Sequence, residues 1–246
     1  MSSAFGAAPT VDRSGPRGSY SGAVRRPFDA ILFDLDGTLA DSAEDIADAL
    51  DEAFRALGLA PARPVAALVD GSPLEELFAV AAPGADPAVF ERFVRAYRGA
   101  YAASGHRRTR LYPGVAETLD ALASLRPPVR LAVATSKRSD AARHLAEAMS
   151  IAHRFEHIEG SGASTLRPKP APDLLHMLAR RMDVAPARAL MVGDTARDVA
   201  AGRAAGMRTA AVLYGLGARE ELLAERPDHV LEDIEDVLAL LHDARS

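Results

Sequence analysis

Short apolar runs alternate with helical patterns along most of this sequence. Each run is only a few residues long and mostly apolar, which is typical of strands that are buried on both faces. The runs are Phe28–Phe33, Val129–Ala134, Ala189–Val192 and Thr209–Leu213, with Phe155–Ile158 as a weaker fifth. Apolar residues at helical spacing fill the segments between them. This alternation predicts an α/β fold with a Rossmann-like, doubly wound parallel sheet.

The segment from Ser42 to Arg110 interrupts the alternation, because it contains three helical patterns and no convincing strand. The first helix has a capping signal, with Asp45 three residues after Ser42, and is expected to end at Gly58. The second is expected to open with Ser72, Pro73 and Glu75, and the third with Asp86 and Pro87. We therefore predict an inserted α-helical cap domain at residues 43–111, and a core formed by residues 27–42 and 112–246.

Apolar and aromatic residues recur at helical spacing in the third helix of the insertion. They are Phe90, Phe93, Val94, Tyr97 and Tyr101. This spacing favours packing inside the cap over a role in binding.

The first 26 residues are rich in Ser, Gly, Ala, Pro and Arg and show no apolar periodicity. This composition predicts a disordered N-terminal tail. A basic targeting or docking arm built on its arginines is the alternative.

The composition excludes some classes of partner and metal site. A net charge of -5 at pH 7 disfavours nonspecific binding to nucleic acid or to an anionic membrane, and no apolar run approaches the length of a membrane span. The absence of cysteine excludes disulfides and thiolate metal sites, so any metal must bind oxygen or imidazole. A cytoplasmic location is expected by default. The chain has only two lysines, Lys137 and Lys169.

Polar side chains follow the predicted strands at the points where the strands end. They are Asp34 and Asp36 after the first strand, Thr135 and Ser136 after the second, and Asp194 after the strand that ends at Val192. Because the carboxyl ends of parallel strands share one edge of a sheet, we expect these side chains to lie close together. Lys169 precedes a helix expected to start near Pro172, and its loop can reach the same edge.

Each of these acids has an ordinary structural explanation when taken alone, such as a tight turn at Asp36 or a helix cap at Asp194. Together, Asp34, Asp36, Asp194 and Asp198 crowd negative charge at one sheet edge, which repulsion makes costly without a cation. Oxygen ligands without cysteine or neighbouring histidine suit a hard cation, and at a phosphate site this is Mg²⁺ more often than Ca²⁺. The sequence therefore predicts Mg²⁺ as the cofactor.

A carboxylate beside a phosphate-binding metal suggests nucleophilic catalysis. Asp34 would attack phosphorus and form an aspartyl phosphate, which divides a difficult hydrolysis into two displacements. Asp36, two residues on, would protonate the departing alcohol and then deprotonate the attacking water. Lys169 and the Thr135 hydroxyl would hold the remaining phosphoryl oxygens.

At these residues the chain resembles the haloacid dehalogenase-like hydrolases, and within them the phosphoglycolate phosphatase-like members with a helical cap. The resemblance covers nearly everything from Phe28 onward. Its carriers are the segments DLDGTLADS from Asp34, TSK from Thr135, RPKPAPD around Lys169 and GDTARD from Gly193. The first segment alone is highly specific.

The resemblance implies a role for each matching residue. Asp34 is the nucleophile, Asp36 the acid and base, Thr135 and Lys169 bind phosphate, Asp194 is a magnesium ligand, and Gly37 and Ser136 offer backbone amides to phosphate. Asp36 would bind the metal through its backbone carbonyl. Asp198 would support Lys169 or the metal's water shell rather than bind the ion directly.

The sequence also separates members of this family. Dehalogenases lack the second acid, which is present here as Asp36, and phosphonoacetaldehyde hydrolases need a cap lysine that this cap lacks. The expected activity is hydrolysis of a small phosphorylated metabolite such as 2-phosphoglycolate. A 5′-nucleotidase is the alternative, suggested by the segments FEHIEGSG and YGLGAREEL, and a sugar phosphomutase remains open although Thr38 favours a phosphatase. A noncatalytic partner-binding protein is the alternative of a different class.

The residues that select the substrate are less clear from the sequence, and so is the oligomeric state. Several cap residues could pair with a second anionic group of a substrate or form a solvated hinge loop: Arg63, Arg98, His106, Arg107, Arg108 and Arg110. The loop Gly71–Leu74 resembles the cap loop that faces the active site in this family. Tyr214, Gly215 and Gly217 form either a loop near the site or a simple turn.

Overall fold

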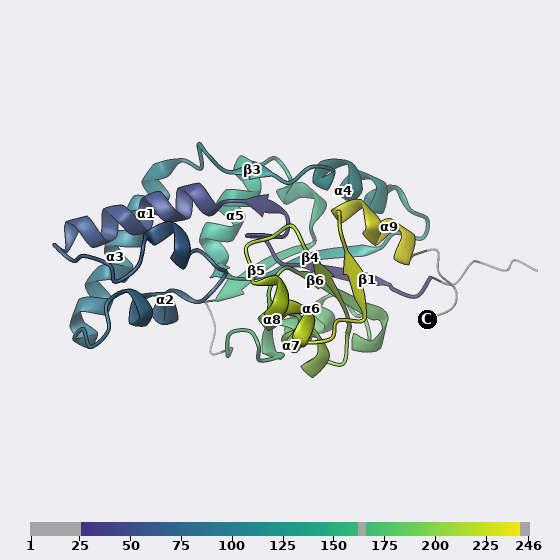
Figure 1. Cartoon of the computed structure of the whole chain (residues 1–246). Helices are drawn as coiled ribbons and strands as arrows, with labels where there is room; N and C mark the ends of the chain where they lie inside the picture. Colours follow the sequence, from purple (N-terminus) through teal and green to yellow (C-terminus); the bar gives the residue numbers. More distant parts are fainter. Residues whose placement is uncertain (1–25, 162–165, 242–246) are drawn as a thin grey trace, which may run out of the picture.

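The computed structural model describes residues 26–161 and 166–241. Figure 1 shows two parts side by side, a layer of helices formed by α1 to α3 and a larger α/β part that contains the sheet. The predicted tail, residues 1–26, lies outside the described residues except for Arg26, whose guanidinium donates to the carbonyls of Arg126 and Pro127.

The α/β part is built on a six-stranded sheet with the order β5-β4-β1-β6-β7-β8, in which each neighbouring pair is parallel. Its strands are β1 (Ala30–Phe33), β4 (Arg130–Arg138), β5 (His157–Ser161), β6 (Ala189–Gly193), β7 (Arg208–Val212) and β8 (His229–Leu231). The five predicted strands are confirmed, but β4 continues beyond its expected end at Ala134 and β5 starts later than Phe155. The sequence does not predict β8, because so short a strand offers no recognisable apolar run.

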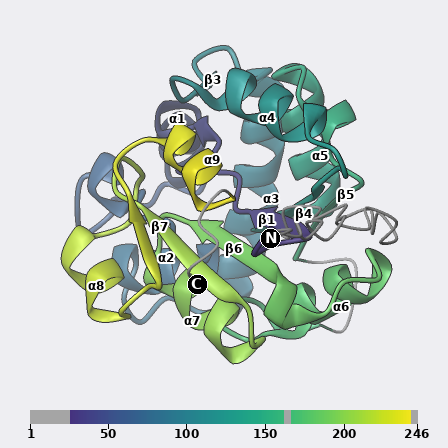
Figure 2. The ribbon, with the colours of Figure 1, turned by 90° about the vertical axis from the view of Figure 1, so that its right-hand side faces the viewer.

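Helices cover both faces of this sheet, as predicted for a doubly wound fold. Side chains alternate along β1, so that Ile31 and Phe33 join one hydrophobic cluster while Ala30 and Leu32 join another. The first cluster includes α4 (Val115–Ser124), α5 (Ser139–Ala148) and α9 (Val237–Leu240); the second includes α6 (Asp173–Arg181) and α7 (Ala196–Ala204). Figure 2 shows the sheet lying between these two groups of helices.

The remaining elements of the α/β part are short. Helix α8 (Arg219–Ala224) packs through Leu222 against Val199 and Ala211. Three 3-10 turns complete it: η2 (Ala152–Arg154), η3 (Pro186–Arg188) and η4 (Ile234–Asp236). None of the helices in the described ranges combines the length and the apolar character that a membrane span requires.

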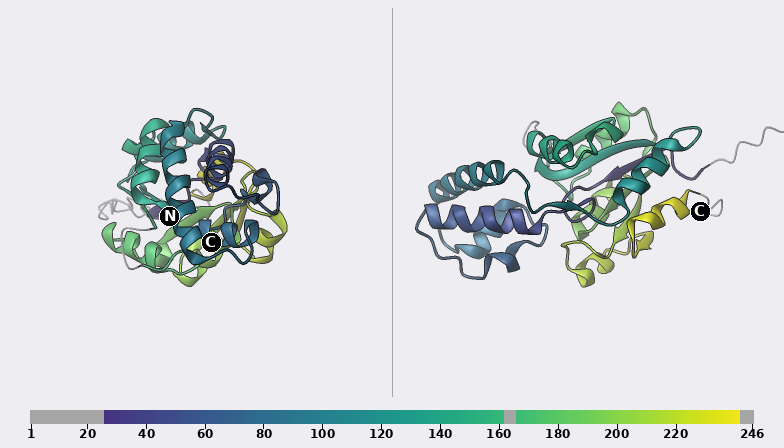
Figure 3. Two further views of the ribbon diagram at one scale, coloured as in Figure 1. Left: turned by 90° about the vertical axis from the view of Figure 1, so that its left-hand side faces the viewer. Right: turned by 90° about the horizontal axis from the view of Figure 1, so that it is seen from above.

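The predicted helical cap is confirmed, and Figure 3 shows its helices from above, beside the α/β part. The cap has a hydrophobic cluster of its own. Its elements are α1 (Ala43–Ala56), η1 (Val65–Leu68), α2 (Leu74–Ala81) and α3 (Pro87–Ser104). Phe93 lies at the centre of this cluster, with ring centroids 4.6 Å from Phe54 and 4.7 Å from Phe78. The exact division of the chain at residues 43 and 111 remains a prediction.

The two connections between cap and sheet run side by side. Strand β2 (Ala40–Asp41) pairs antiparallel with β3 (Arg110–Leu111), so the chain leaves and re-enters through one two-stranded ribbon. The sequence does not reveal these strands, because two residues carry no periodicity. The ribbon holds the start of α1 near the end of β1, where Asp34 lies.

Two of the three predicted helix starts differ in detail. Helix α1 begins after Ser42, but the Ser42 side chain makes no capping bond; its hydroxyl donates to Asp36 Oδ1 at 2.5 Å instead. Helix α2 begins after Pro73, which precedes the first helical residue rather than occupying it. Helix α3 begins as expected, with the Asp86 carboxylate accepting from the amide of Ala88 at 2.7 Å.

Candidate active site

Asp34 lies at the carboxyl end of the central strand β1. In the sheet register, the last β1 residue, Phe33, pairs with Val133 of β4 on one side and with Val192 of β6 on the other. The chain passes from β4 to the outer strand β5 and then returns to the other side of β1 as β6. Such a reversal in strand order opens a crevice at the carboxyl edge. Asp34 therefore stands in the position where a doubly wound sheet binds its ligands.

Lys169 brings three parts of the chain together at this edge. Its Nζ donates to Asp34 Oδ1 at 2.8 Å, to the Ala134 carbonyl at 2.9 Å and to Asp198 Oδ1 at 2.5 Å. Burial alone would lower the pKa of Lys169, but the carboxylates of Asp198 and Asp34 raise it above its ordinary value. The lysine is therefore a fixed positive charge beside the predicted nucleophile.

Asp198 uses both of its oxygens within the protein. While Oδ1 accepts from Lys169, Oδ2 accepts from the Thr195 amide at 3.1 Å and from the Thr195 hydroxyl at 2.5 Å. These bonds cap the start of α7 and fix the carboxylate, which is 1% exposed. The contacts agree with a supporting role for Asp198, although direct metal binding stays open.

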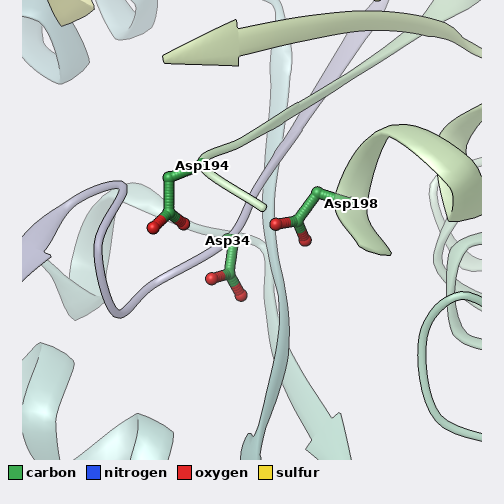
Figure 4. A group of neighbouring side chains, drawn as sticks. All are labelled: Asp34, Asp194 and Asp198. Atoms are coloured by element: carbon green, nitrogen blue, oxygen red, sulfur yellow. The ribbon is translucent and has the colours of Figure 1, made fainter. Parts of the chain in front are cut away.

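Asp34, Asp194 and Asp198 form a compact group of buried carboxylates. Each offers an oxygen within 4.8 Å of the others, and Figure 4 shows the three side chains converging on a common space. Burial raises the pKa of Asp34, an effect that Lys169 opposes and that Asp198 and Asp194 reinforce. Burial and the charge of Asp198 likewise raise the pKa of Asp194. Three hard oxygen donors with this unfavourable charge fit a divalent cation.

Asp194 sits in a cradle formed by two loops. Its Oδ1 accepts from the Thr38 hydroxyl at 3.0 Å, and its Oδ2 accepts from the amides of Leu216 and Gly217 at 2.8 and 3.2 Å. A Cβ at Gly215 would lie 2.3 Å from the Asp194 Cβ, so no side chain fits there. This contact decides between the two interpretations of the loop after the last predicted strand: it adjoins the site.

Gly37 is the other glycine on which this cradle depends. Its backbone has a φ of 84°, which favours glycine, and a Cβ there would lie 2.1 Å from Asp194 Oδ2. The turn after Asp36 thus brings the backbone directly against the group of buried carboxylates. The Tyr214 hydroxyl donates to the Thr38 carbonyl at 2.8 Å and ties the second loop to the same turn.

Asp36 is not part of this group of buried carboxylates. Ser42 donates to its Oδ1, and Lys137 Nζ lies 3.2 Å from its Oδ2. The predicted metal contact of Asp36 is through its carbonyl and stays a prediction. Lys137 is a site residue that we do not identify from the sequence, although it lies in the TSK segment and is one of only two lysines.

Three of the four predicted phosphate-binding residues line one pocket, and Gly37 does not. Thr135, Ser136 and Lys169 border it together with Gly160 and Arg167. Thr135 and Ser136 lie within β4, where the pairing with β5 becomes irregular between Thr135 and Arg138. The Thr135 hydroxyl accepts from the Lys137 amide at 3.2 Å. The pocket thus joins the Lys169 and TSK segments at the sheet edge.

The cap contacts the core beside this edge. A Cβ at Gly71 would lie 2.7 Å from Thr195 Cγ2, so the cap loop packs directly on the loop that follows Asp194. Glu76 of α2 forms an ion pair with Arg197 of α7. A second pocket is lined by residues 70–72 of the cap and by residues 195–197, 217, 218 and 221 of the core.

The cap arginines considered as anion partners are exposed in the structure. These exposed arginines are Arg63, Arg98, Arg107, Arg108 and Arg110. Arg108 pairs with Glu44 and Asp48 on the outside of α1. Arg110 donates to the carbonyls of Arg107 and Thr109. These contacts support the solvated hinge loop rather than a binding site, with buried His106 as the exception.

Known proteins resemble the chain in both sequence and structure. The family model of the haloacid dehalogenase-like hydrolases matches residues 31–212. A phosphoglycolate phosphatase of Photobacterium profundum is 32% identical over 223 residues, covering 85% of this chain and 93% of that protein. The phosphoglycolate phosphatase of Escherichia coli is 33% identical over 236 residues, covering 86% and 91%.

Among solved structures, one described as "a predicted phosphoglycolate phosphatase" from Haemophilus somnus superposes with a TM-score of 0.78. It is 28% identical and covers 87% of this chain and 98% of its own. The matched region of the family runs from β1 to β7 and contains the three buried carboxylates and Lys169. The chain therefore belongs to the haloacid dehalogenase-like hydrolases, and it is a phosphatase.

Proposed function

We propose that this protein is a Mg²⁺-dependent phosphomonoesterase that acts through an aspartyl phosphate on Asp34, with 2-phosphoglycolate as its substrate. The observation that carries the proposal is that Asp34 accepts a hydrogen bond from Lys169 and lies beside two further buried carboxylates, Asp194 and Asp198. The phosphoglycolate phosphatases that cover most of this chain support the choice of substrate.

The first displacement uses the groups at the sheet edge. Asp34 Oδ forms a bond to phosphorus while the bond from phosphorus to the alcohol oxygen breaks. Lys169 and the Thr135 hydroxyl hold the phosphoryl oxygens, assisted by the backbone amide of Ser136. The Gly37 amide, also predicted for this role, donates to the Ala40 carbonyl at 2.9 Å in the structure. A bound Mg²⁺ would be held by Asp34, Asp194 and the Asp36 carbonyl, and it would offset the repulsion between carboxylate and phosphate.

Asp36 moves the proton in both halves of the reaction. Its carboxyl gives a proton to the leaving alkoxide, and its carboxylate then takes one from the water that attacks phosphorus and releases Asp34. Ser42 and Lys137 each bind one of its oxygens, so its side chain has a fixed orientation. Asp198 touches neither reacting group in this scheme and positions Lys169 through the shared hydrogen bond.

Initial rates with a panel of phosphate esters test the substrate. With Mg²⁺ present, we expect the highest kcat/KM for 2-phosphoglycolate and lower values for nucleoside monophosphates and sugar phosphates. Turnover restricted to nucleotides would support the 5′-nucleotidase alternative instead. Transfer of phosphate to a second sugar hydroxyl, without release of inorganic phosphate, would identify a mutase.

The mechanism is tested separately by Asp34→Asn. The amide keeps the shape of the side chain but is not an anionic nucleophile, so turnover should disappear for every ester. An acid-quenched reaction of the unmodified protein should carry the added phosphoryl mass on the peptide that contains Asp34. Activity that survives in Asp34→Asn would refute the assignment of the nucleophile whatever the substrate is.

A further inference from the structure

Lys137 is a buried cation at the site that the proposed steps use only to orient Asp36. Its side chain is 10% exposed, and it lies in β4 between the phosphate-binding Thr135 and the surface residue Arg138. Burying an ammonium group is costly unless it is paired. The chain has only two lysines, and both are placed at this sheet edge.

The ammonium group touches both the core and the cap. Its Nζ lies 3.2 Å from Asp36 Oδ2 and 4.1 Å from the centroid of the Tyr101 ring, which belongs to α3. A cation over an aromatic face is attracted to it. Tyr101 is therefore more than a packing residue of the cap, contrary to the expectation from its helical spacing.

The donors of Lys137 are only partly used. An ammonium group has three N–H donors. Within residues 26–161 and 166–241, the structure gives Lys137 one carboxylate partner and one aromatic ring. The Tyr101 hydroxyl is also buried without a hydrogen-bond partner among the described residues. A polar ligand at this place would therefore meet free donors of Lys137, beside a cap residue whose own hydroxyl is unpaired among the described residues.

The two lysines divide the site between phosphate and leaving group. Lys169 contacts Asp34 and Asp198, where the phosphoryl group must lie for Asp34 to attack it. Lys137 contacts Asp36, whose proton goes to the leaving oxygen. The part of the substrate beyond that oxygen must extend on the Asp36 side, within reach of Lys137. In glycolate, the carboxylate is attached to the carbon that carries this oxygen.

We propose that the Lys137 ammonium, covered by the Tyr101 ring, binds an anionic group next to the leaving oxygen, the glycolate carboxylate being the group that fits. The proposal rests on the proposed function and names the residue that sets its substrate preference. It replaces the exposed cap arginines as the partner of a second substrate anion. Since Tyr101 comes from the cap, the bound carboxylate would also hold cap and core together.

Three esters separate anion binding from the orientation of Asp36. The first is 2-phosphoglycolate, the second is 2-hydroxyethyl phosphate, whose leaving group is similar but uncharged, and the third is p-nitrophenyl phosphate, whose leaving group departs without a proton. We expect Lys137→Met to lower kcat/KM for 2-phosphoglycolate by about 10- to 100-fold more than for 2-hydroxyethyl phosphate, the usual effect of losing a charge-assisted hydrogen bond. Lys137→Arg should recover part of this preference.

Each result decides between the two roles of Lys137. Equal losses of kcat/KM for 2-phosphoglycolate and 2-hydroxyethyl phosphate, with a smaller loss of kcat/KM for p-nitrophenyl phosphate, would overturn the proposal and leave Lys137 as a positioning residue. Arg138→Gln is the matched control, because Arg138 is the neighbouring cation but pairs with Asp140 at 2.9 Å. A selective loss in Arg138→Gln rather than in Lys137→Met would also overturn it. Circular dichroism and thermal unfolding show whether each variant is folded.

The unmodified protein tests the proposed function independently. If it prefers 2-phosphoglycolate but Lys137→Met keeps that preference, the substrate stands and the role of Lys137 fails. If it shows no preference for 2-phosphoglycolate over 2-hydroxyethyl phosphate, both fail while the phosphatase activity stands.

A binding measurement without turnover is available because the chain has only two lysines. In Asp34→Asn protein labelled with ¹³C and ¹⁵N in its lysine side chains, 2-phosphoglycolate should shift the Lys137 signal. The Lys137 signal is the one that disappears when Lys137→Met is introduced into the same protein. An equal shift with 2-hydroxyethyl phosphate would contradict binding of the carboxylate.

Discussion

Replacing Asp194 by asparagine tests whether the site is destabilised by its own negative charge until a cation binds. The substitution keeps the shape of the side chain and removes one charge from the group of three buried carboxylates. The hydrogen bonds can survive the change. The asparagine oxygen can accept from the amides of Leu216 and Gly217, and its NH₂ can donate to the Thr38 hydroxyl, which is able to reverse its role.

The size of the effect follows from the pKa of Asp194. Burial, reinforced by the charge of Asp198, raises this pKa from 3.8 to about 6. An ionised carboxyl with such a shift lowers the free energy of unfolding at neutral pH by about 3 kcal/mol. Allowing for weaker hydrogen bonds to a neutral amide, we expect metal-free Asp194→Asn to be more stable than the unmodified protein by about 1–3 kcal/mol. For a chain of this length that raises Tm by roughly 3–10 °C.

Mg²⁺ should remove or reverse this difference. Free metal at about 100 times its Kd stabilises a folded protein by about 2.7 kcal/mol. The unmodified protein should gain this stabilisation, whereas Asp194→Asn has lost a ligand and should gain little. Thermal unfolding followed by circular dichroism, in EDTA and in increasing Mg²⁺, measures both quantities without relying on activity.

Asp45→Asn is a matched control for this experiment. The Asp45 carboxylate is also buried, and its Oδ2 accepts from the amides of Arg108 and Thr109 and from the Thr109 hydroxyl, but it lies outside the acidic group. We expect it to lower stability by about 1–3 kcal/mol with and without Mg²⁺. A metal-free Asp194→Asn protein that is less stable than the unmodified one, or that gains as much from Mg²⁺, would refute the charge-repulsion argument.

Three further predictions follow from the same contacts. Gly215→Ala should lower the free energy of unfolding by about 2–4 kcal/mol and weaken Mg²⁺ binding, because the added Cβ would meet Asp194. In the control Gly99→Ala, at an exposed position of α3, the added Cβ meets nothing within 4 Å. This control should raise the free energy of unfolding, measured by chemical denaturation, by about 0.5–1 kcal/mol. Asp36→Asn should lower kcat/KM, which reports the step that forms the aspartyl phosphate, by about 10²–10⁴-fold for alkyl phosphates and much less for p-nitrophenyl phosphate. Equal losses of kcat/KM would exclude a proton-donor role. In EDTA, the Tm of the unmodified protein relative to that of Asp194→Asn should fall as the pH rises from 3.8 through about 6, because burial raises the pKa of Asp194 to about 6 and the folded state binds this proton more tightly than the unfolded state. A difference in Tm that does not change with pH would show that this pKa is not raised.

The sheet and the residues at its carboxyl edge could be predicted from the sequence because both follow from short-range patterns. Apolar runs separated by helices define a parallel sheet, and its topology brings the ends of β1 and β6 together without any knowledge of side-chain contacts. This is why Asp34 and Asp194, 160 positions apart, could be placed at one site before their contacts were known. The hydrogen bonds between their loops depend on the exact turn at Gly37, which the sequence only suggests.

Lys137 and Tyr101 show where that reasoning stops. Helical spacing correctly places Tyr101 on the inner side of α3, but spacing does not say which element it faces across the gap between cap and core. The contact with Lys137 depends on how the β2–β3 ribbon positions the cap, and each of those strands is too short to leave a pattern. The only indication in the sequence that Lys137 belongs to the site was the small number of lysines. Both lysines lie at the site, whereas arginine supplies the positive charge of the surface.

The first turn of α1 shows how local signals are used for long-range contacts. Ser42 and Asp45 have the spacing of a capping box, yet neither makes the capping bond. Ser42 binds the proton-transfer residue Asp36, and Asp45 binds the chain where it returns from the cap at Arg108 and Thr109. Both side chains are buried, and each is bound to its distant partner instead of the amides of the first turn. The first turn of α1 therefore links Asp36, the proposed acid and base, to the two chain segments that connect the cap to the sheet. A shift of the cap relative to the sheet would also move Asp36.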